Sequence, residues 1–514
     1  MATSPIGGLP TAAELSTARA DVARLSTRDL AGQLVVARYA GTAPAAAAAL
    51  VGRLHLGGVA VFAGNVPTAT AAVVPTLREV ARAATAALAG QGRRWPAFLA
   101  VDQEGGPVTR VGAPATAFPA AMALGAAGGD VLARQVGAAS GAELAAMGFT
   151  VVLAPDADVT IGPSDPTIGV RSPGGDPRLV ARVAVGLARG YAEAGLVPVA
   201  KHFPGHGSVT TDSHLGLPRQ ARSVTVLERR DLVPFRALVD QGAPAVMTAH
   251  IVVTGLDDAR PASLSRGVTT GLLRERLGFT GLVVTDALEM DAVTAGYGAG
   301  RAAVLAVQAG ADVLLMPADP GAAVDALVTA VDRRQLTRTR LVDSAARMVA
   351  TLRHAARRTR SRPSPGTVGS HRGTARALAD AAVTVVSGPC RGRLVGSAIS
   401  VTGALSADRG GLAAAALRAG LHVGGGTQVR LLGGGVYNAG SRSASGSETG
   451  SGDVVVALDV PYGLARSSAR TARLAAYGRT SATFDAVVAV LLGRQPARGH
   501  LPVPVGDHKI GTGC

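Results

Sequence analysis

The chain has 514 residues, of which 47 % are hydrophobic and 3 % aromatic, and it carries a formal net charge of +16. This length supports two domains with cores of small aliphatic side chains. The arginines are scattered and show neither an aromatic-interleaved pattern nor a nucleic-acid motif, so we expect no nucleic-acid partner. No signal segment opens the chain, and no stretch of membrane-spanning length lacks polar residues. We therefore expect no membrane span and, for the chain as given, a cytoplasmic location.

Short apolar runs, typical of buried strands, recur as far as residue 316. The predicted strands are 34–37, 58–62, 97–101, 150–154, 197–200, 245–248, 282–285 and 312–316. Most of the segments between them have helical spacing, and the predicted helices are 75–88, 130–147, 177–194, 227–241 and 300–309. This alternation predicts an α/β fold, a (β/α)8 TIM-type barrel over residues 1–355, with a doubly wound open sheet as the alternative.

Polar residues stand at or just past the ends of these apolar runs. They are Asp102, Asp156, Asp158, Lys201, His202, His250 and Asp286. The catalytic groups of a barrel gather at the carboxyl ends of its strands, whereas an open sheet draws on fewer strands. The placement therefore favours the barrel and predicts a site at that end.

The last third of the chain has a different pattern. The basic, proline-containing segment 356–374 is predicted to be a solvated linker. From 375 to 514, apolar runs alternate with Ala-rich helical stretches, which predicts a smaller α/β sandwich domain. The predicted strands and helices of this domain are 383–386, 412–419, 454–460 and 482–492.

Glycines and cysteines give little functional information in this part of the chain. The glycine-rich stretches 424–426, 433–435 and 441–452 lack the Gly-Lys-Ser/Thr of a phosphate loop, so we expect flexible surface loops. Cys390 and Cys514 do not have metal-ligand spacing, and the sequence leaves open whether they pair.

The segment 201–207 (Lys-His-Phe-Pro-Gly-His-Gly), followed by Asp212, Ser213 and His214, gathers proton-handling side chains in one glycine-rich turn. Lys201 is one of only two lysines among 51 basic residues. A compact ammonium that donates to closely spaced oxygens is not replaced by a planar guanidinium, which gives a physical reason for this exception. The composition indicates a reaction site, and the glycines predict a mobile loop that closes on substrate.

Six motifs, found in a fixed order, carry a family resemblance. They are 101–106 (Val-Asp-Gln-Glu-Gly-Gly), 201–207, 212–214, 247–250 (Met-Thr-Ala-His), 261–265 (Pro-Ala-Ser-Leu-Ser) and 285–290 (Thr-Asp-Ala-Leu-Glu-Met). Together they resemble glycoside hydrolase family 3, specifically its β-N-acetylglucosaminidase branch, over most of residues 30–320. The segments 461–462 (Pro-Tyr) and 499–503 (Gly-His-Leu-Pro-Val) show a weaker likeness to the second domain of the family. Pro107 and Pro173 depart from the family pattern, which bears on the substrate subsites.

The resemblance implies a retaining exo-β-N-acetylglucosaminidase that cleaves muropeptide or chitin-type oligosaccharides through a covalent glycosyl-enzyme. It places the nucleophile on Asp286, and the strand end at this position independently suits a rigidly held carboxylate. It places the acid/base on His214, paired with Asp212. An imidazole has a reference pKa of about 6.5, so it exchanges protons near neutral pH with little tuning.

The resemblance also implies substrate contacts for Asp102, Arg171, Lys201 and His202, and we expect Arg110 to add a contact or support. Glu104 is expected to be structural. His206 and Asp158 are expected to shape the loops, while His250 is open between direct contact and support. The histidine spacings match no compact zinc motif and Lys201 would repel a cation, so we expect no metal and no cofactor.

Two other functions remain open. A phosphorylase would use the same residues, because a histidine acid/base lacks the fixed negative charge that repels phosphate. A non-catalytic glycan-binding protein would hold the sugar without cleaving it, and loss of Asp286 or His214 would be its mark, but both are present. The expected partner is a carbohydrate in each case. The sequence does not indicate the oligomeric state.

Overall fold

Eight parallel strands form a nearly closed barrel in the computed structural model, which describes residues 5–358, 363–433 and 448–514. The strand order is β11-β9-β7-β6-β3-β2-β1-β12. A parallel bridge between Val284 and Val313 joins the two ends of this order. The strands are β1 (Val35–Arg38), β2 (Gly58–Val61), β3 (Phe98–Val101), β6 (Val151–Val152), β7 (Val197–Phe203), β9 (Ala245–Thr248), β11 (Leu282–Thr285) and β12 (Leu314–Leu315). Each predicted barrel strand is confirmed.

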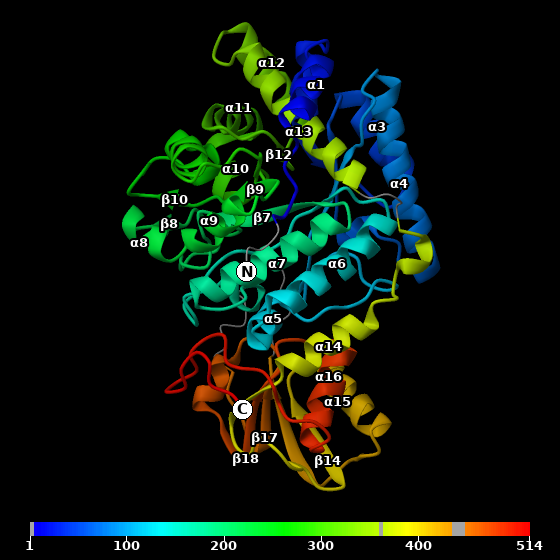
Figure 1. Cartoon of the computed structure of the whole chain (residues 1–514), viewed down its shortest axis with the longest axis vertical. Coiled ribbons are helices and arrows are strands. Elements are labelled where there is room, and N and C mark those ends of the chain that lie inside the picture. Colours follow the sequence, from blue (N-terminus) through cyan, green and yellow to red (C-terminus); the bar gives the residue numbers. More distant parts are fainter. Residues whose placement is uncertain (1–4, 359–362, 434–447) are drawn as a thin grey trace.

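Helices lie on the outside of the barrel (Figure 1). Four predicted helices are confirmed as α4 (Thr70–Gly90), α6 (Asp130–Ala146), α7 (Pro177–Glu193) and α11 (Ala299–Ala309). The other longer helices of this part are α1 (Ala12–Val22), α2 (Thr27–Gln33), α3 (Pro44–Leu54), α5 (Ala121–Ala127), α10 (Asp291–Tyr297), α12 (Pro320–Asp332) and α13 (Arg338–Arg358).

The prediction of one helix over 227–241 is wrong. The structure has two helices here, α8 (Val224–Arg229) and α9 (Leu232–Asp240). In a continuous helix the ring of Pro234 would clash with the carbonyl of Arg230, four residues earlier. The break before α9 places this proline in a first helical turn, where it is tolerated.

A six-stranded sheet forms the core of the second domain, at the bottom of Figure 1. Its order is β13-β18-β17-β16-β14-β15. Among the described strands of this sheet, the β13–β18 pair is antiparallel and the other neighbours are parallel. The strands are β13 (Thr384–Ser387), β14 (Ala398–Gly403), β15 (His422–Val423), β16 (Thr427–Leu432), β17 (Ser451–Ala457) and β18 (Ser468–Ala475). Its longer helices are α14 (Arg372–Ala382), α15 (Ser406–Arg418) and α16 (Ser481–Leu491). The predicted architecture, a barrel followed by a smaller α/β domain, is confirmed.

Helices extend into the predicted linker from both sides. Residues 356–358 belong to α13 and residues 372–374 belong to α14, while 359–362 lie outside the described residues. The boundaries at 355 and 375 remain predictions. Of the predicted glycine-rich loops, 434–435 and 441–447 lie outside the described residues. The loop prediction is wrong for Ser451 and Gly452, which belong to β17, whereas 424–426 form a bend with positive φ before β16.

The end of the chain lies against a loop of the barrel. The amide of Gly175 donates to Pro502 O (3.0 Å), and the amide of His500 donates to Ala126 O (2.9 Å). A disulfide joins Cys390 to Cys514, which answers the question that the sequence left open. Disulfides are typical of oxidising compartments, so this pairing argues against a cytoplasmic location. The cytoplasmic location remains a prediction. Within the described ranges, no helix has the length and hydropathy that crossing a membrane requires.

Candidate active site

A cavity of about 230 Å³ opens at the carboxyl end of the barrel strands. It is lined by every predicted site residue except Asp212: Asp102, Arg110, Arg171, Lys201, His202, His214 and Asp286. A larger hollow of about 690 Å³ is mainly apolar and lies at the other end of β3, beside Pro96 and Ala97. The smaller cavity is the candidate active site because the ionisable groups converge there.

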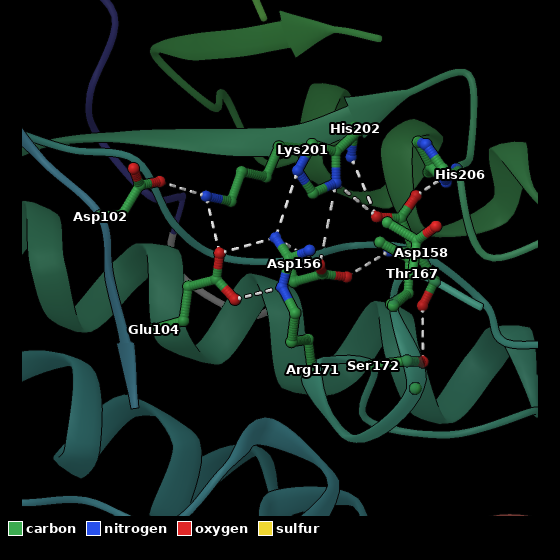
Figure 2. A network of polar contacts seen from close by, with 12 residues as sticks. Asp102, Glu104, Asp156, Asp158, Thr167, Arg171, Ser172, Lys201, His202 and His206 are labelled. Carbon is green, nitrogen blue, oxygen red and sulfur yellow. Dashed lines mark hydrogen bonds and ion pairs between the residues drawn. The ribbon is translucent and has the colours of Figure 1, made fainter. Parts of the chain in front are cut away.

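Lys201 joins two carboxylates at one side of this cavity (Figure 2). Its Nζ lies 2.6 Å from Asp102 Oδ1 and 2.7 Å from Glu104 Oε1. Burial alone would lower the pKa of Lys201, but Asp102 and Glu104 raise it above its ordinary value. The amine is therefore a charged ammonium at neutral pH.

Arg171 is the second cation of this network. It donates to Glu104 through Nε (2.9 Å) and through one terminal nitrogen (2.8 Å). Burial would raise the pKa of Glu104, but Arg171 and Lys201 hold it well below its usual range. Glu104 lines the cavity and pairs with both cations, which fits the expected structural role; that role remains a prediction.

His202 follows Lys201 on β7 and is held by Asp158. Its Nδ1 lies 2.6 Å from Asp158 Oδ2, and its Nε2 lies 3.3 Å from the guanidinium of Arg171. Since guanidinium nitrogens only donate, Nε2 accepts and Nδ1 carries the proton. Asp158 also accepts from the His206 amide, which agrees with the expected role of Asp158 in shaping the loops.

Asp156, Asp158 and His202 could offer three metal-ligand atoms within 4.8 Å of one another. They fit a cation poorly, because Arg171 lies 3.7 Å from Asp156 and the His202 Nδ1 proton faces Asp158. Burial and the neighbouring Asp158 raise the pKa of Asp156 well above its usual value, which weakens this carboxyl as a metal ligand. The expected absence of a metal remains a prediction.

Asp286 follows β11 and lines the cavity. Its Oδ1 accepts from the Ala287 amide at 2.8 Å. Burial would raise the pKa of Asp286, but His202, His250 and this amide lower it to about 2. Asp286 is thus an anionic carboxylate with a fixed orientation, as nucleophilic attack requires.

His250 is fully buried, and both of its ring nitrogens are bonded. Nδ1 lies 2.7 Å from Ser263 Oγ, and Nε2 lies 2.9 Å from Ala287 O. A carbonyl only accepts, so Nε2 carries the proton, and burial lowers the pKa of His250 below its ordinary value. Of the two roles left open by the sequence, support of the segment that carries Asp286 fits this geometry.

Asp212 and His214 form a pair in the loop between β7 and β8 (Arg219–Gln220). Asp212 Oδ1 lies 2.7 Å from His214 Nδ1 and also accepts from the His214 amide at 2.9 Å. Burial would raise the pKa of Asp212, but its bonds to His214 lower it. The carboxylate therefore fixes the imidazole with Nε2 free for proton exchange.

The sequence analysis missed a cluster at the rim of the cavity. Arg38 and Arg110 lie over the ring of Phe62, with guanidinium carbons 4.8 Å and 5.3 Å from the ring centre. Arg38 also pairs with Glu289 at 2.7 Å. Arg38 stands at the end of β1, so the placement rule that found Asp102 and Asp286 would have found it, whereas Phe62 is part of the predicted apolar run 58–62.

The fold and the cavity define a (β/α)8-barrel protein with an ionisable site at the carboxyl end of its strands. A model of the glycosyl hydrolase family 3 N terminal domain matches residues 26–352, and the chain belongs to glycosyl hydrolase family 3. The family resemblance predicted from the motifs is therefore confirmed.

Several relatives are similar to this chain. Beta-hexosaminidase A of Pseudoalteromonas piscicida is 34 % identical over 292 residues, which are 54 % of this chain and 48 % of that protein. A beta-hexosaminidase of Neisseria meningitidis serogroup C (strain 053442) is 38 % identical over 226 residues, which are 43 % of this chain and 62 % of that protein. The matched segments thus span less than two thirds of these relatives.

A solved structure is similar over almost the whole chain. It is a glycoside hydrolase family 3 beta-N-acetylglucosaminidase from Paenibacillus sp. str. FPU-7, with a TM-score of 0.82 and 29 % identity. The similarity covers 94 % of this chain and 99 % of that one. M tuberculosis LpqI has a TM-score of 0.59 and 33 % identity, covering 65 % of this chain and 96 % of that one. These relatives support the predicted branch of the family.

Proposed function

We propose that the protein is a retaining exo-β-N-acetylglucosaminidase that removes terminal non-reducing N-acetylglucosamine from muropeptide or chitin-type oligosaccharides. One observation carries the proposal: an anionic carboxylate, Asp286, and a carboxylate-oriented imidazole, His214, line the same cavity. The names of the relatives supply the sugar.

In the first step, a carboxylate oxygen of Asp286 attacks the anomeric carbon as the glycosidic bond breaks. His214 Nε2 gives its proton to the leaving oxygen, and Asp212 stabilises the imidazolium before this transfer. The product is a covalent glycosyl ester on Asp286 and a free alcohol.

In the second step, the neutral His214 takes a proton from water. The water oxygen attacks the anomeric carbon and releases the carboxylate of Asp286. Two inversions at this carbon retain the β configuration of the sugar.

The polar network beside these groups suits the hydroxyls of one sugar. Asp102, Arg110, Arg171, Lys201 and His202 are the proposed contacts, since each lines the cavity. Buried groups that pair with hydroxyls discriminate strongly between sugars, because a sugar that lacks the matching hydroxyl leaves these groups unpaired. Glu104 keeps Lys201 and Arg171 in place for this task.

A phosphorylase is the second candidate function. The group that faces the leaving oxygen is an imidazole, which lacks the fixed negative charge of a carboxylate and repels phosphate less. Phosphate would then take the place of water and release a sugar 1-phosphate. The fold is also that of the solved beta-glucoside phosphorylase BglX, which has a TM-score of 0.82 and 22 % identity over 97 % of this chain and 98 % of that one.

The test is turnover of 4-nitrophenyl β-N-acetylglucosaminide with and without phosphate, with identification of the sugar released. We expect free N-acetylglucosamine from the wild type and none from Asp286→Asn. The matched control is Asp325→Asn, which removes an exposed carboxylate paired with Arg28. Phosphate-dependent sugar 1-phosphate would favour the phosphorylase, and binding without turnover would favour a glycan-binding protein.

A further inference from the structure

Ser213 stands between the two members of the Asp212–His214 pair, yet the proposed reaction does not use it. Its side chain is buried, with 1 % of the residue exposed, although the loop around it belongs to the surface of the barrel. Its Oγ lies 2.8 Å from Nε2 of His206, a ring that is itself only 2 % exposed. A buried hydroxyl is costly unless it is bonded, so this contact favours one position of the loop.

The surroundings of His206 indicate the direction of this hydrogen bond. Its Nδ1 is buried and has no hydrogen-bond partner among the described residues. An unpaired buried N–H is rarer and costlier than an unpaired lone pair, so the proton lies on Nε2. Burial also lowers the pKa of His206 to about 4, which keeps the ring neutral. His206 therefore donates to Ser213 Oγ.

His206 is itself fixed by the core of the site. Its backbone amide donates to Asp158 Oδ1, and Asp158 Oδ2 holds Nδ1 of His202 (Figure 2). The next residue, Gly207, packs so closely that a Cβ there would lie 2.6 Å from Val159 O. The donor that Ser213 meets is thus held in a closely packed segment that follows β7.

We propose that Ser213 is a positioning residue for the acid/base: its hydrogen bond to His206 sets the place of His214 over the cavity. This inference rests on the proposed function. Asp212 fixes the orientation of the His214 ring, whereas Ser213 fixes where the segment carrying both residues lies relative to β7. A displacement of about 1 Å in a reacting group costs up to about 10²-fold in rate.

The test compares Ser213→Ala with the wild type on phenyl and 2,4-dinitrophenyl β-N-acetylglucosaminides. The phenyl substrate needs a proton on its leaving oxygen, and the dinitrophenyl substrate does not. We expect kcat to fall about 10- to 100-fold for the phenyl substrate and less than about threefold for the other. Ser213 and His206 also line the cavity, so the difference between the two substrates is the decisive readout: loss of a sugar contact would slow both substrates alike.

Ser208→Ala is the matched control. Ser208 lies in the same loop, is 6 % exposed and accepts from Gln220 at 2.6 Å, whereas the side-chain hydrogen bond of His206 in the described structure goes to Ser213. If general loosening of the loop were the cause, both serine variants would slow both substrates alike, and the proposal would be overturned.

A double-mutant cycle with His206→Ala adds a second test, with thermal unfolding of each variant as the check on folding. We expect the double variant to be no slower on the phenyl substrate than the slower single variant, because both remove one bond. Independent, multiplying effects would contradict the proposal, as would an Ser213→Ala variant with wild-type leaving-group dependence. An inactive wild type would instead refute the proposed function, and this inference with it.

Discussion

Arg171 and Glu104 form a two-pronged ion pair inside the site, with 6 % and 3 % of their side chains exposed. The same carboxylate accepts from Lys201, which also pairs with Asp102, so the two carboxylates together balance the two buried cations. A buried ion pair is stable only while both partners are present, since removal of one partner leaves an uncompensated buried charge.

We expect Glu104→Gln to reduce the free energy of unfolding by about 3–5 kcal/mol. It should also raise KM for the aryl glucosaminide, because Arg171 and Lys201 lose the carboxylate that orients them. Chemical denaturation and steady-state kinetics measure the two effects. Asp325→Asn, at an exposed pair with Arg28, should cost only about 0–1 kcal/mol. Equal effects of the two substitutions would contradict this account.

The buried Asp312 predicts a pH-dependent stability. Burial would raise the pKa of Asp312, but Arg274, Arg347 and Arg340 lower it from 3.8 to about 2. A lowered pKa in the folded state stabilises the fold above the unfolded value, and this contribution is lost as the pH falls from about 3.8 to about 2.

Asp312→Asn should therefore lower Tm strongly at neutral pH, and the difference from the wild type should shrink as the pH falls through this window. Thermal unfolding at a series of pH values between neutrality and pH 2 measures it. A difference that stays constant over the whole series would show that the charge of Asp312 does not contribute.

The acid/base assignment predicts a strong dependence on the leaving group. His214→Ala should slow the phenyl glucosaminide by about 10²–10⁴-fold and the dinitrophenyl substrate far less. Asp212→Asn should also slow the phenyl substrate more than the dinitrophenyl substrate, because an amide no longer stabilises the imidazolium. His422→Ala, at an exposed histidine of β15, is the control for losing an imidazole elsewhere. A uniform loss on both substrates would assign His214 to binding instead.

The Cys390–Cys514 disulfide predicts a redox-dependent stability. Its removal should cost about 2–5 kcal/mol, and a reductant should reproduce the effect in the wild type. Denaturation curves of Cys390→Ser with and without reductant measure both. The variant should be insensitive to reductant, and an equal response of variant and wild type would contradict the prediction.

The sequence predicts the barrel well because its strands are buried on both faces and appear as continuous apolar runs. In the second domain, β18 carries Ser468, Arg470 and Arg473 among its apolar residues, so no such run marks it. The break before α9 is also predictable in principle, since Pro234 disfavours a continuous helix, although α4 continues through Pro75.

Site residues at strand ends are predictable from position, and the motifs add their roles. The ion-pair partners are not predictable from position, because Glu104, Lys201 and Arg171 are distant in sequence and only the fold brings them together. The same holds for Cys390 and Cys514, which are 124 residues apart in sequence. Spacing contains no information about such a pairing.

The burial of Lys201 restricts the sites at which amine-reactive reagents can modify the chain. Lys201 is 2 % exposed and its ammonium is held between two carboxylates, so it offers no free amine to such a reagent. Lys509, the other lysine, is exposed. An amine-directed dye or immobilisation resin should therefore attach to Lys509 of the second domain and leave Lys201 of the barrel unmodified.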